Sequence, residues 1–174
     1  MMKKSIILLI LVLTLFGCSS GARYRTNNAN SRIYYADVDG DGVKDVVEAE
    51  DKYSSNGEFI VTFRKDNKNG DVIDSFTVPG RVRDIKSNAL NMDFQEWVFI
   101  SFSDKDNVPG IAVYQLIDNS ASKIFFATSE YKIEVDFSSV PKIKIGKPPK
   151  NINSPSLTPE WEIWFWSGDK FLQY

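Results

Sequence analysis

Apolar and polar residues alternate with a period of two along most of this chain. In residues 131–137, Tyr, Ile, Val and Phe alternate with Lys, Glu and Asp, and residues 59–64 alternate in the same way. This is the period of a β-strand that turns one face to a core and the other to water. Further runs rich in β-branched and aromatic residues, typical of strands, lie at 32–38, 72–78, 96–102, 110–117, 123–127 and 160–166.

Residues that favour chain reversal separate these runs. They are Asn56-Gly57, Asn69-Gly70, Pro79-Gly80, Pro109-Gly110 and Ser167-Gly168-Asp169. The sequence therefore predicts an all-β fold: a small antiparallel β domain of about eight to eleven short strands, built as a sandwich or as partial propeller-like sheets. Residues 84–93 fit a strand or a short helical turn equally well.

The N-terminus has the pattern of an export signal. Lys3 and Lys4 precede a mostly apolar run, Ile6 to Phe16, which is shorter than the roughly 20 residues that span a bilayer. The run ends in Leu15-Phe16-Gly17-Cys18, which resembles the bacterial lipobox. That resemblance implies cleavage before Cys18 and attachment of lipid to its sulfur, so that Cys18 anchors the protein to a membrane.

This interpretation divides the chain into three segments. We expect a lipoprotein signal peptide at 1–17, the lipidated cysteine with a flexible polar tether at 18–31, and a single β domain at 32–174. The expected location is the bacterial cell envelope, in the outer membrane if the host has two membranes, because Ser19 rather than Asp follows the cysteine. Cys18 is the only cysteine, so an intramolecular disulfide is excluded.

Composition narrows the chemistry further. The 174 residues include no histidine, which excludes His-dependent nucleophilic catalysis and His-ligated metals. With 21 Lys and Arg against 23 Asp and Glu, the net charge of −2 gives no basic excess for binding nucleic acid. We therefore expect a protein that is not an enzyme; a glycosidase using a carboxylate pair, Glu130 with Glu134 or Glu160 with Glu162, is a less favoured alternative.

One acidic segment has the spacing of a calcium loop. Counting from Asp37, carboxylates occupy positions 1, 3, 5 and 9, as Asp37, Asp39, Asp41 and Asp45, and position 6 is glycine. Ca²⁺ takes six to eight oxygen ligands, and alternate side chains of a tightly curled loop turn inward. Without a cation, four carboxylates this close would repel one another. The alternative is an acidic turn that water simply solvates.

Two known loops share this spacing, and the flanks distinguish them. An EF-hand requires flanking helices and an apolar residue at position 8; here position 8 is Lys44, and the flanks favour strands, although Glu48 stands at position 12. The segment resembles the strand-loop-strand calcium loop of FG-GAP repeats in integrin-type β-propellers. That resemblance implies Ca²⁺ bound by the four aspartate carboxylates and the backbone of Val43. The motif does not recur: residues 104–107 begin similarly, but Val108 and Pro109 come next.

The C-terminal region is rich in tryptophan. Residues 160–171 predict an aromatic hairpin, with Glu162, Trp164 and Trp166 on one face of its first strand. Trp164 and Trp166 are candidate ligand-binding residues that would stack on a sugar or a protein partner, although packing within the sheet is the preferred interpretation. The lysines of residues 142–150 are interpreted as belonging to a solvated edge strand, where their charge would prevent pairing with another strand.

Together these features favour one function. We expect a lipid-anchored envelope protein with a structural calcium site, acting as a binding or adhesion-type module for an envelope protein or glycan. The alternative is a structural or assembly lipoprotein without a ligand.

Overall fold

The computed structural model describes residues 31–50, 58–90, 94–148 and 159–174. The predicted signal peptide, Cys18 and all of the predicted tether except Ser31 lie outside the described residues. Those described form twelve strands, which confirms the predicted all-β class. The strands are β1 (Ser31–Ala36), β2 (Asp45–Glu50), β3 (Phe59–Arg64), β4 (Val72–Val78), β5 (Arg81–Ala89), β6 (Glu96–Ser103), β7 (Pro109–Ile117), β8 (Ser120–Thr128), β9 (Ile133–Asp136), β10 (Lys142–Lys147), β11 (Glu160–Trp166) and β12 (Phe171–Gln173).

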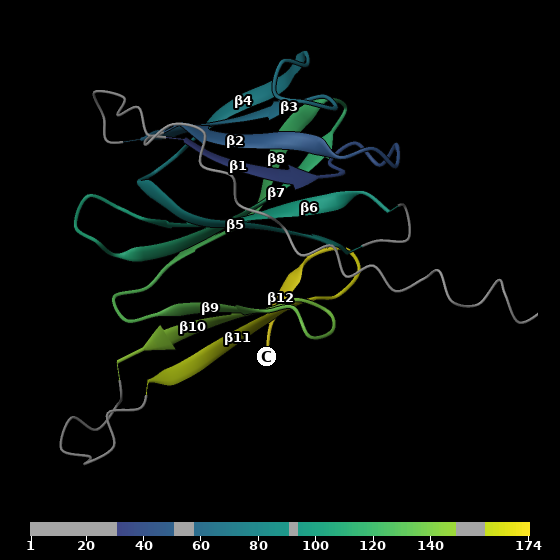
Figure 1. Ribbon diagram of the computed structural model, residues 1–174. Helices are drawn as coiled ribbons and strands as arrows, with labels where there is room; N and C mark the ends of the chain where they lie inside the picture. The colour runs from purple at the N-terminus through teal and green to yellow at the C-terminus, as the bar shows by residue number, and fades with distance from the viewer. Residues whose placement is uncertain (1–30, 51–57, 91–93, 149–158) are drawn as a thin grey trace, which may run out of the picture.

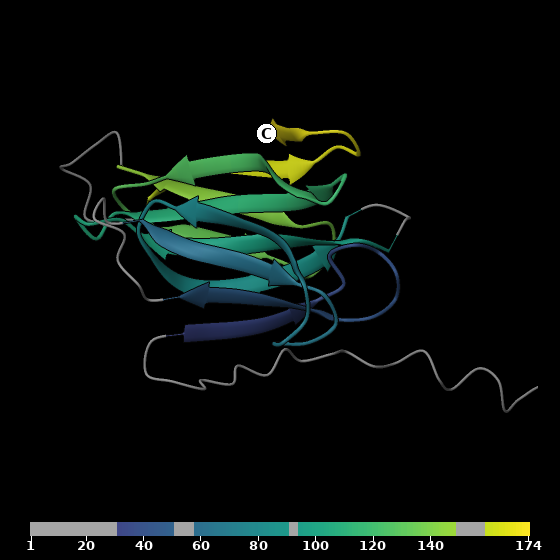
Figure 2. The same ribbon diagram turned by 90° about the horizontal axis from the view of Figure 1, so that it is seen from above.

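These strands form three four-stranded antiparallel sheets, each made of consecutive strands. Sheet A has the order β1-β2-β3-β4, sheet B the order β5-β6-β7-β8, and sheet C the order β12-β11-β10-β9. The sheets are stacked face to face, with sheet B between the other two (Figure 1). Figure 2 looks down on this stack with sheet A nearest the viewer. Where the structure describes the connection, as between β7 and β8 and between β11 and β12, a short reversal joins neighbouring strands, as expected of antiparallel meanders.

The central position of sheet B follows from its sequence. Residues 96–103, Glu-Trp-Val-Phe-Ile-Ser-Phe-Ser, are apolar at consecutive positions rather than at every second one, which is typical of a strand buried on both faces. Trp97 and Phe99 turn to the side of sheet C, whereas Val98 and Ile100 turn to sheet A. All four side chains are buried, and β7 repeats the pattern.

Two hydrophobic cores result, one on each side of sheet B. The core against sheet A includes Phe63, which packs edge-on against Phe76, and Phe76 stacks on Tyr114 with ring centroids 4.0 Å apart. The core against sheet C includes Phe99 and Trp97. Burial of apolar area in these two cores is the main term that stabilises the stack.

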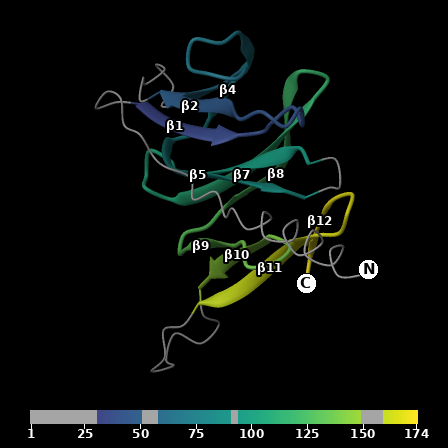
Figure 3. The same ribbon diagram turned by 45° about the vertical axis from the view of Figure 1, so that its right-hand side comes forward.

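Sheets A and B also meet at their edges. The β8 end of sheet B rises beside β4 (Figure 3), and Asp74 on β4 accepts a hydrogen bond from the backbone N–H of Ala121 at 2.7 Å. This contact joins the two layers at one edge.

Two local predictions are corrected. Residues 84–93, left open between strand and helical turn, contribute to β5 as far as Ala89, and residues 91–93 lie outside the described residues. The lysine-rich segment is β10, an interior strand between β9 and β11 rather than an edge. Its Ile143 and Ile145 face the core while Lys142 and Lys144 pair with Asp136 and Glu134 on β9. Among the described residues, no helix has the length and apolar character that crossing a bilayer requires.

Candidate metal centre

The predicted metal loop connects β1 to β2. Ala36 at the end of β1 pairs with Asp45 at the start of β2, so residues 37–44 form the turn of an antiparallel hairpin. Strands therefore flank the loop on both sides. The FG-GAP-like interpretation requires flanking strands, whereas an EF-hand requires flanking helices.

Asp37 organises the first half of the loop. Its Oδ1 accepts the backbone N–H of Gly40 at 2.8 Å, and its Oδ2 accepts that of Gly42 at 2.9 Å. Both glycines have positive φ, 79° and 86°, a conformation that L residues with a Cβ rarely adopt. The two glycines thus let the backbone curl around one carboxylate.

Asp39 and Asp41 form the next part of the turn, and both contact the ammonium group of Lys65. Asp39 Oδ1 accepts the N–H of Asp41, and Asp41 Oδ1 accepts the N–H of Val43. Lys65, directly after β3, places its Nζ 3.1 Å from Asp39 Oδ2 and 3.3 Å from Asp41 Oδ2. The hydrogen bond from Val43 and the ammonium of Lys65 hold the pKa of Asp41 below its usual value, and the two carboxylates raise the pKa of Lys65.

Asp45 closes the loop from a buried position. Its side chain is fully buried, and its two oxygens accept the N–H groups of Val38 and Asp66, each at 3.1 Å. Burial raises the pKa of Asp45, because removal from water disfavours the charged form. This carboxylate therefore joins the β1–β2 loop to the β3–β4 loop and is charged at some cost.

The loop brings three of the four predicted carboxylate ligands together. One oxygen each from Asp37, Asp39 and Asp45 lies within 4.8 Å of the others. Asp37 and Asp45 are buried and Asp39 is half-buried. Asp41 is not part of this group and turns to Lys65. The side chain of Val43, predicted to bind through its backbone, is exposed.

Residues of sheet B hold the loop from outside. The N–H of Glu96 donates to the carbonyl of Asp37 at 2.7 Å, and the Glu96 carboxylate accepts the N–H of Asp37 in return. Gln95 donates from its side-chain amide to the carbonyl of Val38 at 2.8 Å. Glu96 also pairs with Lys44. The candidate centre thus lies where sheets A and B join, and its order is coupled to their packing.

Glu48, which would be the twelfth-position ligand of an EF-hand, has a different role. It is an interior residue of β2 that pairs with Thr62 of β3 and Ile33 of β1. Its buried carboxylate forms ion pairs with Arg64 and Lys68, at 3.6 Å and 3.5 Å. It does not belong to the group of three carboxylates.

The donor set fits a metal ion that prefers oxygen. Each carboxylate oxygen has two lone pairs, and the N–H groups around Asp37 and Asp45 occupy one per oxygen. Lone pairs therefore remain for a cation, and a cation would offset the cost of charging buried Asp45. Asp37, Asp39 and Asp45 could hold a metal ion.

Comparisons with known proteins do not extend this result. No family model, no curated protein and no solved structure matches the chain. The resemblance to FG-GAP repeats accordingly rests on the loop residues alone.

The C-terminal tryptophans lie between sheets B and C. Trp166 packs edge-on against Trp97, with ring centroids 4.4 Å apart, and Trp164 packs against Phe125 at 5.4 Å. Both are half-buried and pack against the second core, and neither is in the exposed class. The largest exposed tryptophan surface on this hairpin belongs to Trp161, on the opposite face, with 39% of its area exposed.

Sequence reasoning missed the three side chains that complete the centre. Lys65, Gln95 and Glu96 come from the end of β3 and the start of β6, far from the loop in sequence. A lysine or glutamate directly beside a strand end is common, so no local signal distinguished these residues.

Proposed function

We propose that this protein is a lipid-anchored component of the bacterial envelope that binds a partner and is stabilised by Ca²⁺ in the β1–β2 loop. The observation that carries the calcium site is the convergence of Asp37, Asp39 and Asp45 at the junction of sheets A and B. All three supply carboxylate oxygen, the donor type that Ca²⁺ prefers.

The proposed role of calcium is structural. Extracellular calcium modules bind with dissociation constants of about 10⁻⁴ to 10⁻³ M, which suits an ion that is always present outside the cell. An ion held by Asp45 would stabilise the contact of the β1–β2 loop with the β3–β4 loop. The hydrogen bond between Asp37 and Glu96 would connect the ordered loop to sheet B. The ion would bind the folded chain only, so it would raise stability by mass action.

Thermal unfolding of the full chain in detergent tests the calcium site. Calcium at about ten to a hundred times the dissociation constant should stabilise the fold by about 1.4–2.7 kcal/mol and raise Tm by about 4–8 °C. A chelator should reverse the shift. The double variant Asp39→Asn, Asp41→Asn should lose it, whereas the matched double variant Asp104→Asn, Asp106→Asn should keep it. A flat response of the natural protein would contradict the proposal.

The anchor rests on the lipobox-like residues that end in Cys18. Cells grown with a clickable fatty acid should label the natural protein and not a Cys18→Ala variant, and the variant should leave the membrane fraction. Equal labelling of both proteins would contradict lipidation at this residue.

We propose binding rather than catalysis. Each carboxylate pair considered for a glycosidase has a member engaged by lysine, since Glu134 pairs with Lys132 and Glu162 with Lys147, each at 2.5 Å. The alternative of a structural lipoprotein without a ligand is favoured by one observation: Trp164 and Trp166 are half-buried and pack against the second core. A pull-down from envelope extract, with and without calcium, separates the two functions.

A further inference from the structure

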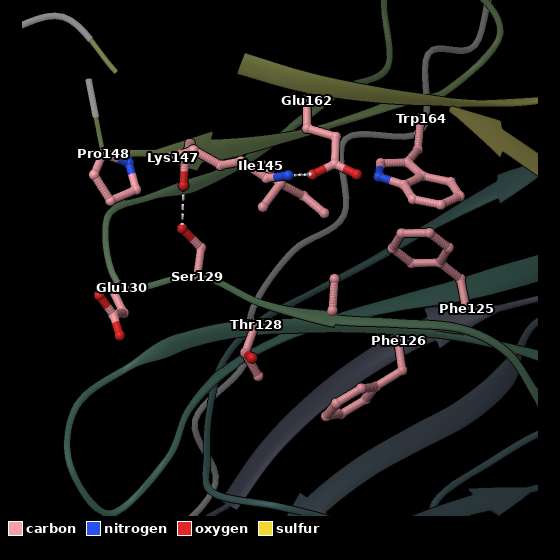
Figure 4. A pocket seen from close by; sticks show the side chains of 12 residues that line it. Phe125, Phe126, Thr128, Ser129, Glu130, Ile145, Lys147, Pro148, Glu162 and Trp164 are labelled. Atoms are coloured by element: carbon pink, nitrogen blue, oxygen red, sulfur yellow. Dashed lines mark hydrogen bonds and ion pairs between the residues drawn. The ribbon is translucent and has the colours of Figure 1, made fainter. Parts of the chain in front are cut away.

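A cavity of about 390 Å³ opens between sheets B and C, away from the metal loop. Its apolar walls come from Phe125 of β8, Ile145 of β10 and Trp164 of β11 (Figure 4). The volume lies in the range of sites that hold small molecules, which are mostly apolar with a few polar groups.

The aromatic wall of this cavity is held in place from behind. The ring of Phe125 contacts Trp164 on one side and Phe171 on another, with centroids 5.4 Å and 4.9 Å apart. Phe171 is buried and packs in turn against Trp166. The wall is therefore formed before any ligand arrives, which lowers the entropic cost of binding.

Two polar groups lie side by side on the wall. The Nε1 of Trp164 is buried and has no hydrogen-bond acceptor, and Figure 4 shows it turned toward the carboxylate of Glu162. The side chain of Glu162 is only 14% exposed and forms an ion pair with Lys147. Trp97 and Trp166 also have unpaired indole nitrogens, but these residues do not line the cavity.

Among the other polar side chains on the lining, Ser129 is already engaged. Ser129 donates its hydroxyl hydrogen to the carbonyl of Gly146. The other polar groups on the lining are the buried Trp164 N–H, the carboxylates of Glu162 and Glu130, the hydroxyl of Thr128 and the ammonium of Lys147, next to flat aromatic surface.

This combination selects the class of ligand. A purely apolar molecule would leave the Trp164 N–H unpaired and would desolvate the ion pair of Glu162 and Lys147, both of which are unfavourable. An anion would meet two carboxylates, Glu162 and Glu130, against one ammonium. A neutral pyranose ring presents a C–H face to the aromatic wall and hydroxyl groups to the donor and the acceptor.

We propose that this cavity binds a pyranose ring of a neutral saccharide. The inference deepens the proposed function, because it supplies the ligand class for a protein that binds rather than transforms. It does not depend on the metal loop, which lies at the other interface of sheet B.

Titration of the full chain with saccharides tests the proposal. The probes are methyl glucoside, N-acetylglucosamine and the corresponding β-1,4-linked disaccharides, observed by tryptophan fluorescence and saturation-transfer NMR. At least one should bind with a dissociation constant of about 1 mM or tighter. Trp164→Phe, which keeps an aromatic ring and removes the N–H, should weaken that binding about tenfold, as expected for one buried hydrogen bond.

Matched variants make the result specific. Trp161→Phe makes the same chemical change on the opposite face of β11 and should leave binding unchanged. Glu162→Gln should weaken binding about tenfold through loss of the charged acceptor, and its Tm should show that the protein still folds. Absence of binding by every saccharide would overturn the proposal, as would equal effects of Trp161→Phe and Trp164→Phe.

Two further measurements separate the possible failures. If the neutral apolar probe N-phenyl-1-naphthylamine binds and is lost in Trp164→Phe while no saccharide binds, the saccharide class is overturned. If a saccharide binds but Tm ignores calcium, the calcium proposal fails and the cavity proposal stands. If Tm responds to calcium and no saccharide binds, the cavity proposal alone fails.

Discussion

Two loops of this protein begin with the same Asp-x-Asp pattern but differ in the structure that follows it. In the β1–β2 loop, Asp37 accepts backbone N–H groups three and five residues later. In the β6–β7 loop, Asp104 accepts those of Asp106 and Val108, two and four residues later, both at 2.9 Å. An aspartate that caps the succeeding backbone is an ordinary way to start a turn.

The two loops differ in the residues that come after the first aspartate. The β1–β2 loop continues through two glycines with positive φ and returns to a buried carboxylate, Asp45. In the β6–β7 loop, Val108 follows the aspartates, and β7 begins at Pro109. This loop is therefore too short to include a closing carboxylate. A capping aspartate therefore does not by itself gather carboxylates that could hold a metal ion; the length of the loop and its closing carboxylate bring them together.

The largest test of this difference is removal of the closing carboxylate. Asp45→Ala leaves the N–H groups of Val38 and Asp66 without their acceptor in a buried place, so we expect a loss of about 3 kcal/mol of unfolding free energy. Asp104→Ala also removes an acceptor of two N–H groups, but water reaches this loop, so the expected loss is about 1 kcal/mol. Chemical denaturation with chelator present measures both.

Asp45→Asn serves as the conservative control. Its amide keeps one oxygen acceptor, so it should lose about half as much stability as Asp45→Ala. If Asp45→Ala cost no more than Asp104→Ala, the closing carboxylate would not distinguish the two loops.

A smaller effect is expected from the glycines that lengthen the first loop. Gly42 has φ of 86° and open space where a Cβ would lie, so Gly42→Ala should cost about 1 kcal/mol through backbone strain alone. Gly168 has φ of 108° and equally open space in the hairpin between β11 and β12, so Gly168→Ala should cost a similar amount. The two variants should differ in calcium response: Gly42→Ala should weaken the Tm shift, and Gly168→Ala should preserve it. A preserved shift in both would show that the curl of the loop is dispensable.

Most of the fold was accessible from the sequence because its strands are short and half-buried. The alternation in residues 59–64 and the run of β-branched and aromatic residues at 72–78 predicted β3 and β4 with the observed bounds. The pattern failed at residues 81–89, where a register shift between Val82 and Asp84 lets Val82 and Ile85, three positions apart, both enter the same core. It also failed at β10, where lysines at alternate positions look like an edge although β9 and β11 flank the strand.

The candidate centre was predictable only along its own loop. The spacing of Asp37, Asp39 and Asp45 is local, and the structure brings these carboxylates together. Lys65 and Glu96 reach the loop through pairing of distant strands, which periodicity does not specify. The preferred interpretation that Trp164 and Trp166 pack within the structure fits their half-buried contacts with the second core, whereas a role of these residues in ligand binding stays a prediction. Trp164 also lines a cavity.

The smallest expected effect comes from Lys65, whose ammonium group contacts the aspartates of the β1–β2 loop. Because Lys65 lies 3.1 Å from Asp39, its ammonium neutralises part of the charge that a metal ion would use. Lys65→Gln should therefore lower Tm in the presence of chelator and tighten calcium binding about threefold, a modest gain because solvent screens this exposed side chain. Lys105→Gln makes the same change in the β6–β7 loop and should alter neither quantity. Calorimetric titration with calcium measures the affinity. Weaker calcium binding by Lys65→Gln would mean that the lysine orders the carboxylates for the ion instead of competing with it. The β1–β2 and β6–β7 loops would then differ in the number of their carboxylates and also in how a lysine positions them.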